Sequence, residues 1–332
     1  MKRIQYNIVE RETRNASGKA KTDVVQILEN YGFQKLYKPA NSQFIRVIQQ
    51  LMGITLLKKN TLLVVQYPAN INFCYRYMSK FRGVKKVAIV HDLESLRKEI
   101  TVEKESSTLR MFDAVISHNP VMTTYLKSIG ITSKIVDLNI FDYLLRPDVI
   151  PSEEHDKRTI AFAGNLSKAK FLFELDKIKE LQFNLYGQKI DGIEILQDKP
   201  NISYKGSFSS DDLIRKLDGG WGLVWDGESL DSCTGITGEY MKYNCPHKVS
   251  MCVVSEKPII IWKKAAMATY ISARNLGITI ESLTELPEIL NSIDSDRYQS
   301  MLNNIRKEKE RLVSGRNLGE ALEALGIKKL PQ

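Results

Sequence analysis

Short apolar runs alternate with helical patterns along the chain, and this alternation constrains the fold more than any other feature of the sequence. Strands that alternate with helices indicate βαβ units, which build a parallel sheet covered by helices on both faces. The runs at 62–65 and 87–90 are continuously apolar, as strands buried on both faces are. We therefore expect a doubly wound α/β fold whose ligands bind outside the carboxyl ends of the strands.

The alternation predicts elements in both halves of the chain. The expected strands cover residues 4–9, 61–66, 86–91, 114–117, 134–138, 159–163, 183–186, 202–205, 221–225, 258–262 and 277–280. The expected helices cover residues 22–31, 42–59, 72–81, 103–112, 120–129, 168–181, 210–217, 246–254, 265–274, 283–293, 296–313 and 317–325.

Residues 146–158 interrupt the alternation. Their sequence, RPDVIPSEEHDKR, combines two prolines with a dense cluster of charges, which is typical of an exposed linker. A chain of 332 residues is long enough for two domains of about 150 residues each. We therefore expect an N-terminal domain over 1–150, a C-terminal domain over 151–315 and a helical tail over 316–332 that packs back on the N-terminal domain.

The composition excludes several classes of protein. A hydrophobic share of 43% with 26% charged residues excludes a disordered chain. No apolar run is long enough for a membrane helix, and the N-terminus lacks the apolar core of a secretion signal. The four cysteines, Cys74, Cys233, Cys245 and Cys252, lack CxxC spacing and are expected to be packing residues in a reducing cytoplasm.

The positive charge lies in the first half. Residues 1–150 carry 23 Lys and Arg against 13 Asp and Glu, whereas residues 151–332 carry 25 against 26. This asymmetry suggests an anionic partner, such as the inner face of a membrane, an acidic protein or a phosphorylated substrate, and a solvated basic surface is the alternative. Nucleic acid is not expected, because no recognised binding motif is present and aromatic residues are not interleaved with the basic ones.

Several familiar catalytic motifs are absent from the sequence. It has no GxGxxG after the first strand, no GxxxxGK[ST], no GxSxG and no HExxH. The four histidines have no metal-ligand spacing. We therefore expect neither a dinucleotide dehydrogenase nor a P-loop enzyme, and no metal site.

Two candidate sites follow the expected strands of the first half. A polar, basic loop over 11–22 contains Ser17 and Gly18 and opens a helix, where backbone N–H groups bind anions or sugar hydroxyls. His91 and Asp92 end a buried strand, so Asp92 can remove a proton from an acceptor hydroxyl while His91 orients it or replaces it. The alternatives are a flexible surface loop and an Asp that caps the next segment.

Two further candidates follow strands of the second half. Gly164 and Asn165 precede Lys168, which begins an expected helix where a cation is unfavourable unless an anion binds. Asn244 or Cys245 would cap a second helix, with His247 and Lys248 in its first turn. A diphosphate at that helix N-terminus would gain from the N–H groups and the ammonium, and a solvent-facing Lys248 is the alternative.

These motifs resemble a group of bacterial sugar transferases. The matching segments are Gly-Gly-Trp-Gly-Leu-Val-Trp-Asp at 219–226, Tyr-Asn-Cys-Pro-His-Lys at 243–248, Lys-Pro-Ile-Ile at 257–260, Phe-Ala-Gly-Asn at 162–165 and His-Asp at 91–92. The group includes the glucosyltransferases that extend O-linked N-acetylglucosamine on serine-rich-repeat adhesins, and β-1,6-galactofuranosyltransferases. The resemblance implies a GT-B fold, in which two Rossmann-like domains face each other across a cleft, the acceptor side first and the nucleotide-sugar side second.

The resemblance also implies roles for individual residues. Lys248 would contact the donor diphosphate, Lys168 fills a position that is often Arg, and Tyr204 matches an aromatic residue near the nucleotide. The loop around Ser17 and Gly18 would lie over the donor. The chain lacks the E-x7-E pair of many retaining GT-B enzymes near 239–251, which favours inversion with Asp92 as the base.

The sequence thus predicts a cytoplasmic, metal-independent glycosyltransferase that needs no cofactor. It would move a hexose, glucose or galactofuranose, from a UDP-sugar to a hydroxyl of a glycan or glycoprotein. Glu239 is a second candidate acid, for the reaction or for sugar hydroxyls. We also expect a homo-oligomer with peripheral membrane contact through the basic half. The alternatives are a nucleotide-sugar epimerase and a non-catalytic partner subunit of another transferase.

Overall fold

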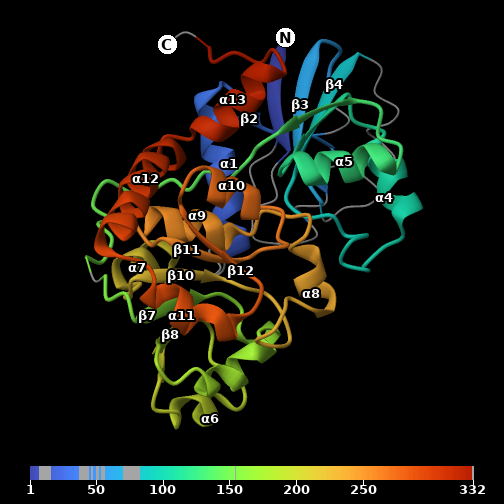
Figure 1. Cartoon of the computed structure of the whole chain (residues 1–332). Coiled ribbons are helices and arrows are strands. Elements are labelled where there is room, and N and C mark those ends of the chain that lie inside the picture. Colours follow the sequence, from blue (N-terminus) through green and yellow to red (C-terminus); the bar gives the residue numbers. More distant parts are fainter. Residues whose placement is uncertain are drawn as a thin grey trace. The chain divides into compact units, whose positions relative to one another are not determined.

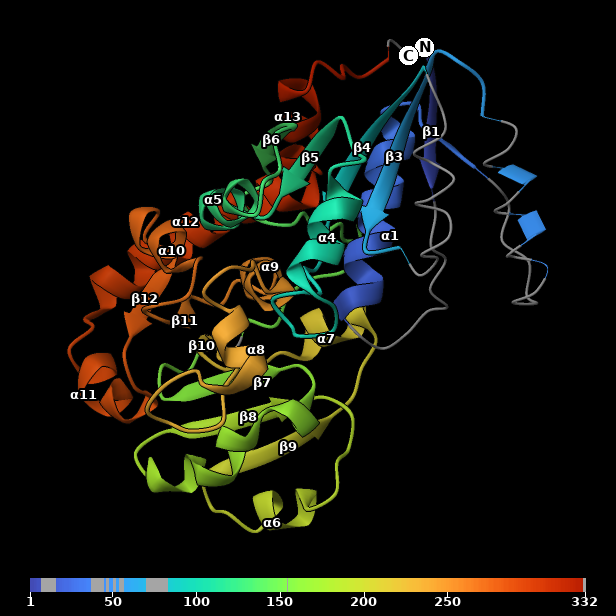
Figure 2. The same ribbon diagram turned by 90° about the vertical axis from the view of Figure 1, so that its right-hand side faces the viewer.

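The computed structural model describes residues 1–6, 16–36, 45, 48–49, 52–53, 57–69, 83–153 and 155–330. Their strands form two six-stranded parallel sheets (Figures 1 and 2), which confirms the doubly wound α/β class. The chain divides into two compact units. The first comprises Met1–Arg11, Lys21–Asn139 and Asn317–Gln332, and the second comprises Glu12–Ala20 and Ile140–Arg316.

The first unit has the strand order β2-β1-β3-β4-β5-β6. Its strands are β1 (Lys2–Tyr6), β2 (Gln34–Lys35), β3 (Thr61–Tyr67), β4 (Val84–Val90), β5 (Ala114–Ser117) and β6 (Lys134–Asp137). Its helices are α1 (Ala16–Asn30), α4 (Val102–Leu109), α5 (Pro120–Ser128) and α13 (Arg316–Ala324). Every residue of β3 is buried, as its continuous apolar run predicts.

Helices cover both faces of this sheet. Figure 1 shows α1 and α13 on one side of the strands and α4 and α5 on the other, as right-handed crossovers require. Tyr31, just after α1, donates a hydrogen bond to Glu323 at a distance of 3.2 Å and lies against Gly319, both on α13. The C-terminal helix is therefore part of the first unit's layer.

The second unit has the strand order β12-β11-β10-β7-β8-β9. Its strands are β7 (Thr159–Ala163), β8 (Gln182–Tyr186), β9 (Ile202–Gly206), β10 (Trp221–Val224), β11 (Ile259–Trp262) and β12 (Gly277–Ile280). Its α-helices are α6 (Ile193–Gln197), α7 (Ser210–Lys216), α8 (Gly235–Tyr240), α9 (His247–Val254), α10 (Ala268–Ala273), α11 (Leu286–Asn291) and α12 (Ser295–Val313). Its 3-10 helices are η1 (Leu166–Lys168), η2 (Lys170–Lys177) and η3 (Leu283–Glu285).

One expected helix has a different geometry. The segment 168–181 forms the 3-10 helices η1 and η2 rather than an α-helix. Its buried residues explain this, because they recur every third residue and a 3-10 helix has three residues per turn. They are Leu166, Ala169, Leu172, Leu175 and Ile178.

Other expectations differ at their ends or lie outside the described residues. α1 begins at Ala16, so Ser17 and Gly18 belong to its first turn and not to a loop. The expected helix at 72–81 lies outside the described residues, and so do most of 42–59 and the end of the strand at 4–9. The short elements β2, α6 and α8 were not expected, since each is too brief to show a hydrophobic period.

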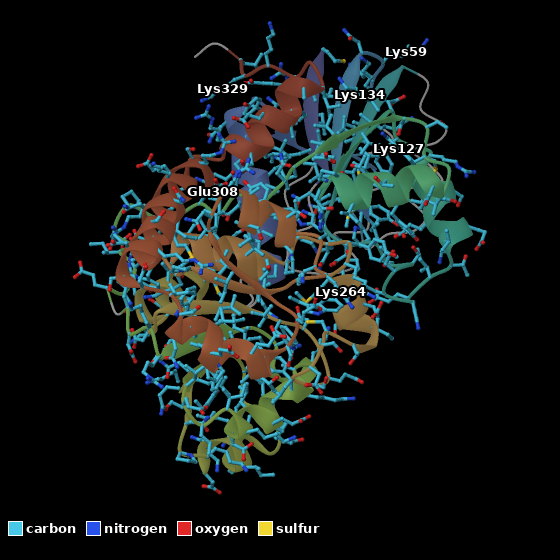
Figure 3. The ribbon with its side chains drawn as sticks, viewed as in Figure 1. Lys59, Lys127, Lys134, Lys264, Glu308 and Lys329 are labelled. Carbon is cyan, nitrogen blue, oxygen red and sulfur yellow. The ribbon has the colours of Figure 1, made fainter. Side chains whose placement is uncertain are left out.

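The two edges of the first sheet differ in chemistry. Its carboxyl edge carries His91 and Asp92 directly after β4. Its amino edge carries lysines, because Lys59 precedes β3 and Lys134 begins β6 (Figure 3). Doubly wound sheets bind their ligands at the carboxyl edge.

Candidate functional site

Lys248 is held at the start of α9 by groups from two strands. Its Nζ lies 2.5 Å from Asp226 Oδ1 and 3.3 Å from the carbonyl oxygen of Trp225, both just after β10. The same nitrogen lies 4.6 Å from the ring centroid of Phe162 on β7. Only 13% of the side chain is exposed, so Lys248 points inward and is not a solvent-facing lysine.

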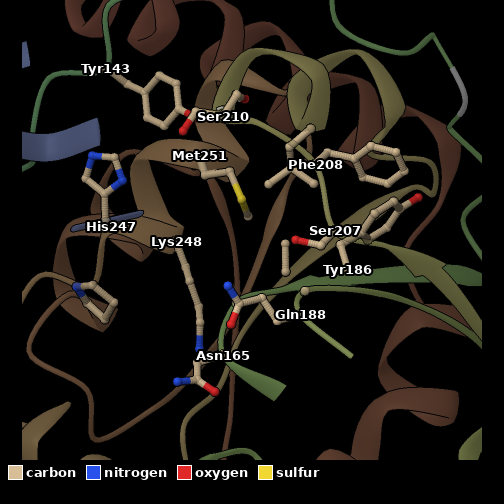
Figure 4. A pocket seen from close by; sticks show the side chains of 15 residues that line it. Tyr143, Asn165, Tyr186, Gln188, Ser207, Phe208, Ser210, His247, Lys248 and Met251 are labelled. Atoms are coloured by element: carbon tan, nitrogen blue, oxygen red, sulfur yellow. Dashed lines mark hydrogen bonds between the residues drawn. The ribbon is translucent and has the colours of Figure 1, made fainter. Parts of the chain in front are cut away.

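A pocket of about 420 Å³ lies at the carboxyl ends of β7 and β8. Gly164 and Asn165 line one side of it, and His247 and Lys248 line another (Figure 4). All of its lining residues belong to the second unit. The pocket thus occupies the position where sheets of this class bind ligands, beside the N-terminus of α9.

The pocket depends on glycine at position 164. A Cβ on Gly164 would lie 2.8 Å from Cε of Lys248, which is closer than side chains pack. Gly187 after β8 is equally crowded, since its Cβ would overlap the carbonyl oxygen of Gly164. The two strand ends therefore approach each other and the lysine without side chains between them.

His247 offers unused hydrogen-bonding groups to this pocket. Both of its ring nitrogens are buried without a hydrogen-bond partner, and its ring stacks on Tyr143 with centroids 5.1 Å apart. Burial, with a smaller effect of the Lys19 charge, lowers the pKa of His247 to about 3. The imidazole is therefore neutral at physiological pH, with one donor and one acceptor. Asn244 Oδ1 is likewise buried and unpartnered.

Buried polar atoms without partners are rare, since each costs about 1–3 kcal/mol. His247 and Asn244 flank the N-terminus of α9, and Pro246 takes the cap position with no side-chain hydrogen bond. Neither Asn244 nor Cys245 caps the helix, which corrects the sequence expectation. Because Pro has no polar side chain that could accept a hydrogen bond, the chain enters α9 without a side-chain cap, and the first N–H groups are left for a ligand.

Lys19, which the resemblance places with Ser17 and Gly18 in the loop over the donor, contacts the lining residue Tyr143 but does not itself line the pocket. It lies in the first turn of α1, in the part of this helix that belongs to the second unit. Its Nζ donates to the carbonyl oxygen of Leu144 over 2.5 Å and lies 4.8 Å from the ring centroid of Tyr143. Gly18 beside it is buried. In the sequence, Lys19 directly follows Ser17 and Gly18 in the basic segment that was expected to lie near the donor.

Several predicted site residues of the second unit do not line the pocket, among them Gly18, Lys168, Tyr204, Glu239 and Asn244. Lys168 is exposed at the end of η1, and Asn165 Oδ1 caps that helix by accepting from the Ser167 N–H over 3.0 Å. The Tyr204 hydroxyl donates to the carbonyl oxygen of Gly187 over 3.0 Å, and Gly187 lines the pocket. Glu239 on α8 is 56% exposed and pairs with Lys242 at 2.6 Å.

Aromatic residues complete the pocket, and sequence reasoning missed them. Tyr186 ends β8 and Phe208 precedes α7, and their ring centroids are 6.3 Å apart. The Tyr186 hydroxyl donates to the carbonyl oxygen of Lys216 over 2.8 Å, and burial raises its pKa to about 12. Gln188 adds an amide to the same wall. The two rings, tilted by 53° to each other, and the Gln188 amide form an apolar wall with a polar edge, which suits a nucleobase.

In the first unit, His91 and Asp92 each have a fixed partner. His91 Nε2 lies 2.7 Å from Gln66 Oε1, and Asp92 Oδ2 lies 3.0 Å from Arg97 Nη1. Both residues are half-buried at the carboxyl edge. The ion pair with Arg97 fixes the orientation of the Asp92 carboxylate.

A buried carboxylate organises the segment that follows Asp92. Glu105 on α4 accepts hydrogen bonds from the N–H groups of Glu94 and Ser95, at 2.7 and 3.2 Å. It also accepts from the Ser95 and Tyr67 hydroxyls. Burial raises the pKa of Glu105 despite these donors. The burial of Glu105 could not be predicted from the sequence, because Glu103 and Glu105 are both acidic residues in the first turn of the same helix.

The described residues contain neither a cluster of metal ligands nor a membrane-spanning helix. Among the described residues, no three His, Cys, Asp or Glu side chains are grouped so as to hold a metal ion. Within the same ranges, no helix is long and apolar enough to cross a bilayer. Cys233, Cys245 and Cys252 are buried thiols, and burial raises the pKa of each to about 12. Cys74 lies outside the described residues.

Two family models match the chain in consecutive segments. The N-terminal domain model of the glucosyltransferase 3-like proteins matches residues 2–140, and the C-terminal domain model matches residues 160–325. Beta-1,6-galactofuranosyltransferase WbbI of Escherichia coli K12 is 32% identical over 93% of this chain and 94% of its own. Glucosyltransferase 3 of Streptococcus gordonii is 24% identical over 87% of both chains.

A solved structure shares the architecture. The complex of Staphylococcus aureus MnaA with UDP superposes with a TM-score of 0.56 at 13% identity, over 100% of this chain and 99% of that one. At this identity the likeness concerns the fold alone. With two doubly wound sheets, the chain has the GT-B fold that its motifs predict.

Proposed function

The chain belongs to the glucosyltransferase 3-like family of GT-B glycosyltransferases, and we propose that it transfers a hexose from a UDP-sugar to a hydroxyl of a glycan or glycoprotein. Relatives that differ in the sugar, glucosyl and galactofuranosyl transferases, match it over most of its length. The proposal therefore commits to a hexose and leaves both sugars as candidates. The observation that carries it is the pocket at the start of α9, with inward-pointing Lys248 and unpartnered His247.

The donor would lie in this pocket with its diphosphate at the N-terminus of α9. Lys248 and the first N–H groups of the helix supply positive charge where the leaving diphosphate becomes more negative. Neutral His247 donates one hydrogen bond to a phosphate or sugar oxygen. Tyr186 and Phe208 offer their rings to the uracil, and Gln188 offers its amide to the base edge.

The acceptor hydroxyl would lose its proton to Asp92. The acceptor oxygen then forms its bond to the anomeric carbon while the bond to the diphosphate breaks, and UDP leaves with the electron pair. This single displacement inverts the anomeric configuration. His91, held by Gln66, orients the carboxylate or replaces it as the base. Ser17, Lys168, Tyr204 and Glu239 remain proposals as donor or acceptor contacts.

The proposed reaction needs no metal or cofactor. The ammonium of Lys248 and the start of α9 would supply the positive charge that a divalent cation supplies in other transferases. We further propose that the chain works in the cytoplasm as a homo-oligomer.

Two other functions remain candidates. A nucleotide-sugar epimerase would use the same donor pocket without an acceptor and would release an isomerised sugar. A partner subunit of another transferase would need neither the unpartnered His247 nor a pocket of donor size. The pocket favours the enzyme.

A thermal-shift screen tests the proposal. UDP and UDP-hexoses should raise the melting temperature, and GDP and CDP should not, because bound ligand stabilises the folded state by mass action. Product analysis with UDP-glucose and UDP-galactofuranose would then separate transfer from isomerisation. No shift with any uridine nucleotide would remove the donor site and favour a partner subunit.

A further inference from the structure

The surplus charge of the first half comes from one segment of the sequence. Residues 30–91 contain ten Lys and Arg and no Asp or Glu, and this net charge equals that of the whole first half. A run of 62 residues without an acid is unusual for a chain with 26% charged residues. The donor pocket uses none of these residues, so the pocket chemistry does not explain them.

The fold gathers lysines at the amino edge of the first unit's sheet. The register pairs Lys2 of β1 with Thr61 of β3, and Thr61 with Val84 of β4, so these strands begin level with one another. The exposed lysines at this edge come from the strand starts, the loop before β3 and the end of the chain. They are Lys2, Lys58, Lys59, Lys85, Lys134, Lys328 and Lys329, here called the lysine edge.

Three observations support this clustering of lysines. Lys59, Lys134 and Lys329 lie toward the same end of the unit in Figure 3. Lys134 donates to the carbonyl oxygen of Ala324 at the end of α13, which ties the C-terminal segment to β6. Leu330 lies against Gly32, between α1 and β2, so that Lys328 and Lys329 flank the same edge.

Few acids oppose the lysine edge. Asp113 accepts from the backbone N–H of Lys86 over 2.7 Å, and Glu323 accepts from Tyr31. Glu29 pairs with Lys35 at 2.9 Å. Among the described residues, no carboxylate forms an ion pair with a lysine of the lysine edge, so the edge keeps a strong positive charge there.

The neighbouring apolar residues indicate what that partner is. Met1 is 61% exposed and Leu330 is 49% exposed, both next to lysines of the edge. Exposed aliphatic side chains among lysines suit the headgroup region of a bilayer, whereas nucleic acid would favour aromatic residues.

We propose that the lysine edge docks the protein on an anionic lipid surface. A second copy is a poorer occupant, because a two-fold contact would place the same positive patch against itself. β3 and β4 each have seven residues, so the opposite edge with Asp92 lies about 20 Å away along the strands. A bilayer at the lysine edge would therefore leave the carboxyl edge accessible.

Vesicle sedimentation tests this docking. The full chain should bind vesicles with about 30 mol% phosphatidylglycerol in about 0.1 M NaCl and be released by about 0.5 M NaCl. It should not bind vesicles of phosphatidylcholine alone. Since each lysine near an anionic bilayer contributes roughly five-fold in partitioning, Lys58→Glu/Lys59→Glu/Lys85→Glu should weaken binding by on the order of 100-fold or more.

A matched variant controls for net charge. Lys179→Glu/Lys264→Glu/Lys307→Glu makes the same charge change at exposed lysines of the second unit and should keep vesicle binding within about three-fold. Both variants should retain the wild-type melting temperature and the shift with UDP. The docking does not depend on the UDP site, so either proposal can fail alone.

Three results would overturn the docking. The first is no sedimentation with anionic vesicles in the low salt, and the second is equal loss of binding in both triple variants. The third is self-association in ultracentrifugation, or binding to random duplex DNA, that the lysine-edge variant abolishes while vesicle binding persists. Self-association of this kind would assign the edge to a second copy, and DNA binding would assign it to nucleic acid.

Discussion

Lys248 lies in the first turn of α9, where its charge opposes the helix dipole, and Asp226 offsets this at 2.5 Å. Gly164 leaves room for the lysine at the strand end, and the Phe162 ring lies beneath the ammonium. A protein that needed only packing here could use Leu or Met. We propose that the ion pair keeps this lysine in place for an anionic ligand.

Lys248→Ala should lower turnover more than donor affinity. The diphosphate gains charge as the glycosidic bond breaks, so the ammonium contributes most in the transition state. One charge-assisted contact is worth about 2–3 kcal/mol, which corresponds to about a 30- to 150-fold lower kcat. Lys307→Ala, which removes an exposed lysine on α12, is the control and should stay near wild type. An effect confined to KM would mean uniform binding of the donor.

Asp92→Asn should abolish most transfer while folding and UDP binding stay intact. Asn keeps the shape of Asp but cannot accept the acceptor's proton, and loss of a positioned base costs about 10²–10⁴ in rate. Kinetics, melting temperature and UDP affinity should be measured together with those of His91→Ala. Near wild-type kcat in Asp92→Asn would remove Asp92 from the mechanism and make Glu239 the next candidate.

Two buried histidines predict how stability depends on pH. Burial lowers the pKa of His118 to about 4 and that of His247 to about 3, from an ordinary value of 6.5. Between pH 6.5 and about 4, the unfolded chain binds protons that the folded chain does not, so stability falls as the pH falls. His118→Gln should reduce the slope by about 1 kcal/mol per pH unit between pH 6 and 5. Chemical denaturation at several pH values measures it, and an unchanged slope would contradict the burial argument.

At the scale of elements, α4 fixes the segment that carries Asp92 and Arg97. Glu105 is fully buried and bonds the N–H groups of Glu94 and Ser95, so the segment after β4 cannot move independently of the helix. Thr101 is the N-cap of this helix, and its side chain accepts a hydrogen bond from the Lys104 N–H. The position of the proposed base, Asp92, thus depends on Glu105, which has no proposed contact with the substrate.

Glu105→Ala should destabilise the protein by about 2–4 kcal/mol, because it leaves buried N–H and hydroxyl donors unpaired. Glu105→Gln keeps one acceptor oxygen and should recover part of this loss. Glu103→Ala removes an exposed carboxylate from the same helix and should change stability by less than about 0.5 kcal/mol. Urea unfolding measures all three, and equal effects at 103 and 105 would contradict the role of Glu105.

Local signals predicted the elements but only part of the site. Buried parallel strands such as β3 and β4 are continuous apolar runs, so their positions could be read directly. The three-residue period of η2 resembles a helical pattern over so short a segment, and the distinction was missed. Tyr186 and Phe208 come from different elements, and only the folded chain brings them together. The burial of His247 likewise depends on neighbours such as Tyr143, far away in sequence.

At the scale of the whole molecule, the two halves of the chain differ in charge and in proposed task. The second unit holds the donor pocket and has nearly balanced charge, whereas the first carries the surplus of basic residues and the proposed base. In the proposed reaction the positive charge at the donor comes from Lys248 and α9, within one unit. This predicts that turnover does not depend on divalent ions.

Activity should therefore survive chelation. Transfer rates measured in EDTA should match those with added Mg²⁺ or Mn²⁺, since the ammonium and helix N–H groups stabilise the leaving diphosphate. Loss of turnover in EDTA that Mn²⁺ restores would contradict this account of the leaving group.

The proposal that the start of α9 binds the donor's diphosphate can be tested by calorimetry. UDP, UMP and uridine would each be titrated into the wild-type protein and into Lys248→Ala. UDP should bind the wild-type protein at least about ten-fold more tightly than UMP, because only UDP places a β-phosphate at the helix N-terminus and the ammonium. Lys248→Ala should remove most of that difference and leave uridine binding unchanged. Equal affinity for UDP and UMP in the wild-type protein, or a difference that survives in Lys248→Ala, would contradict the account.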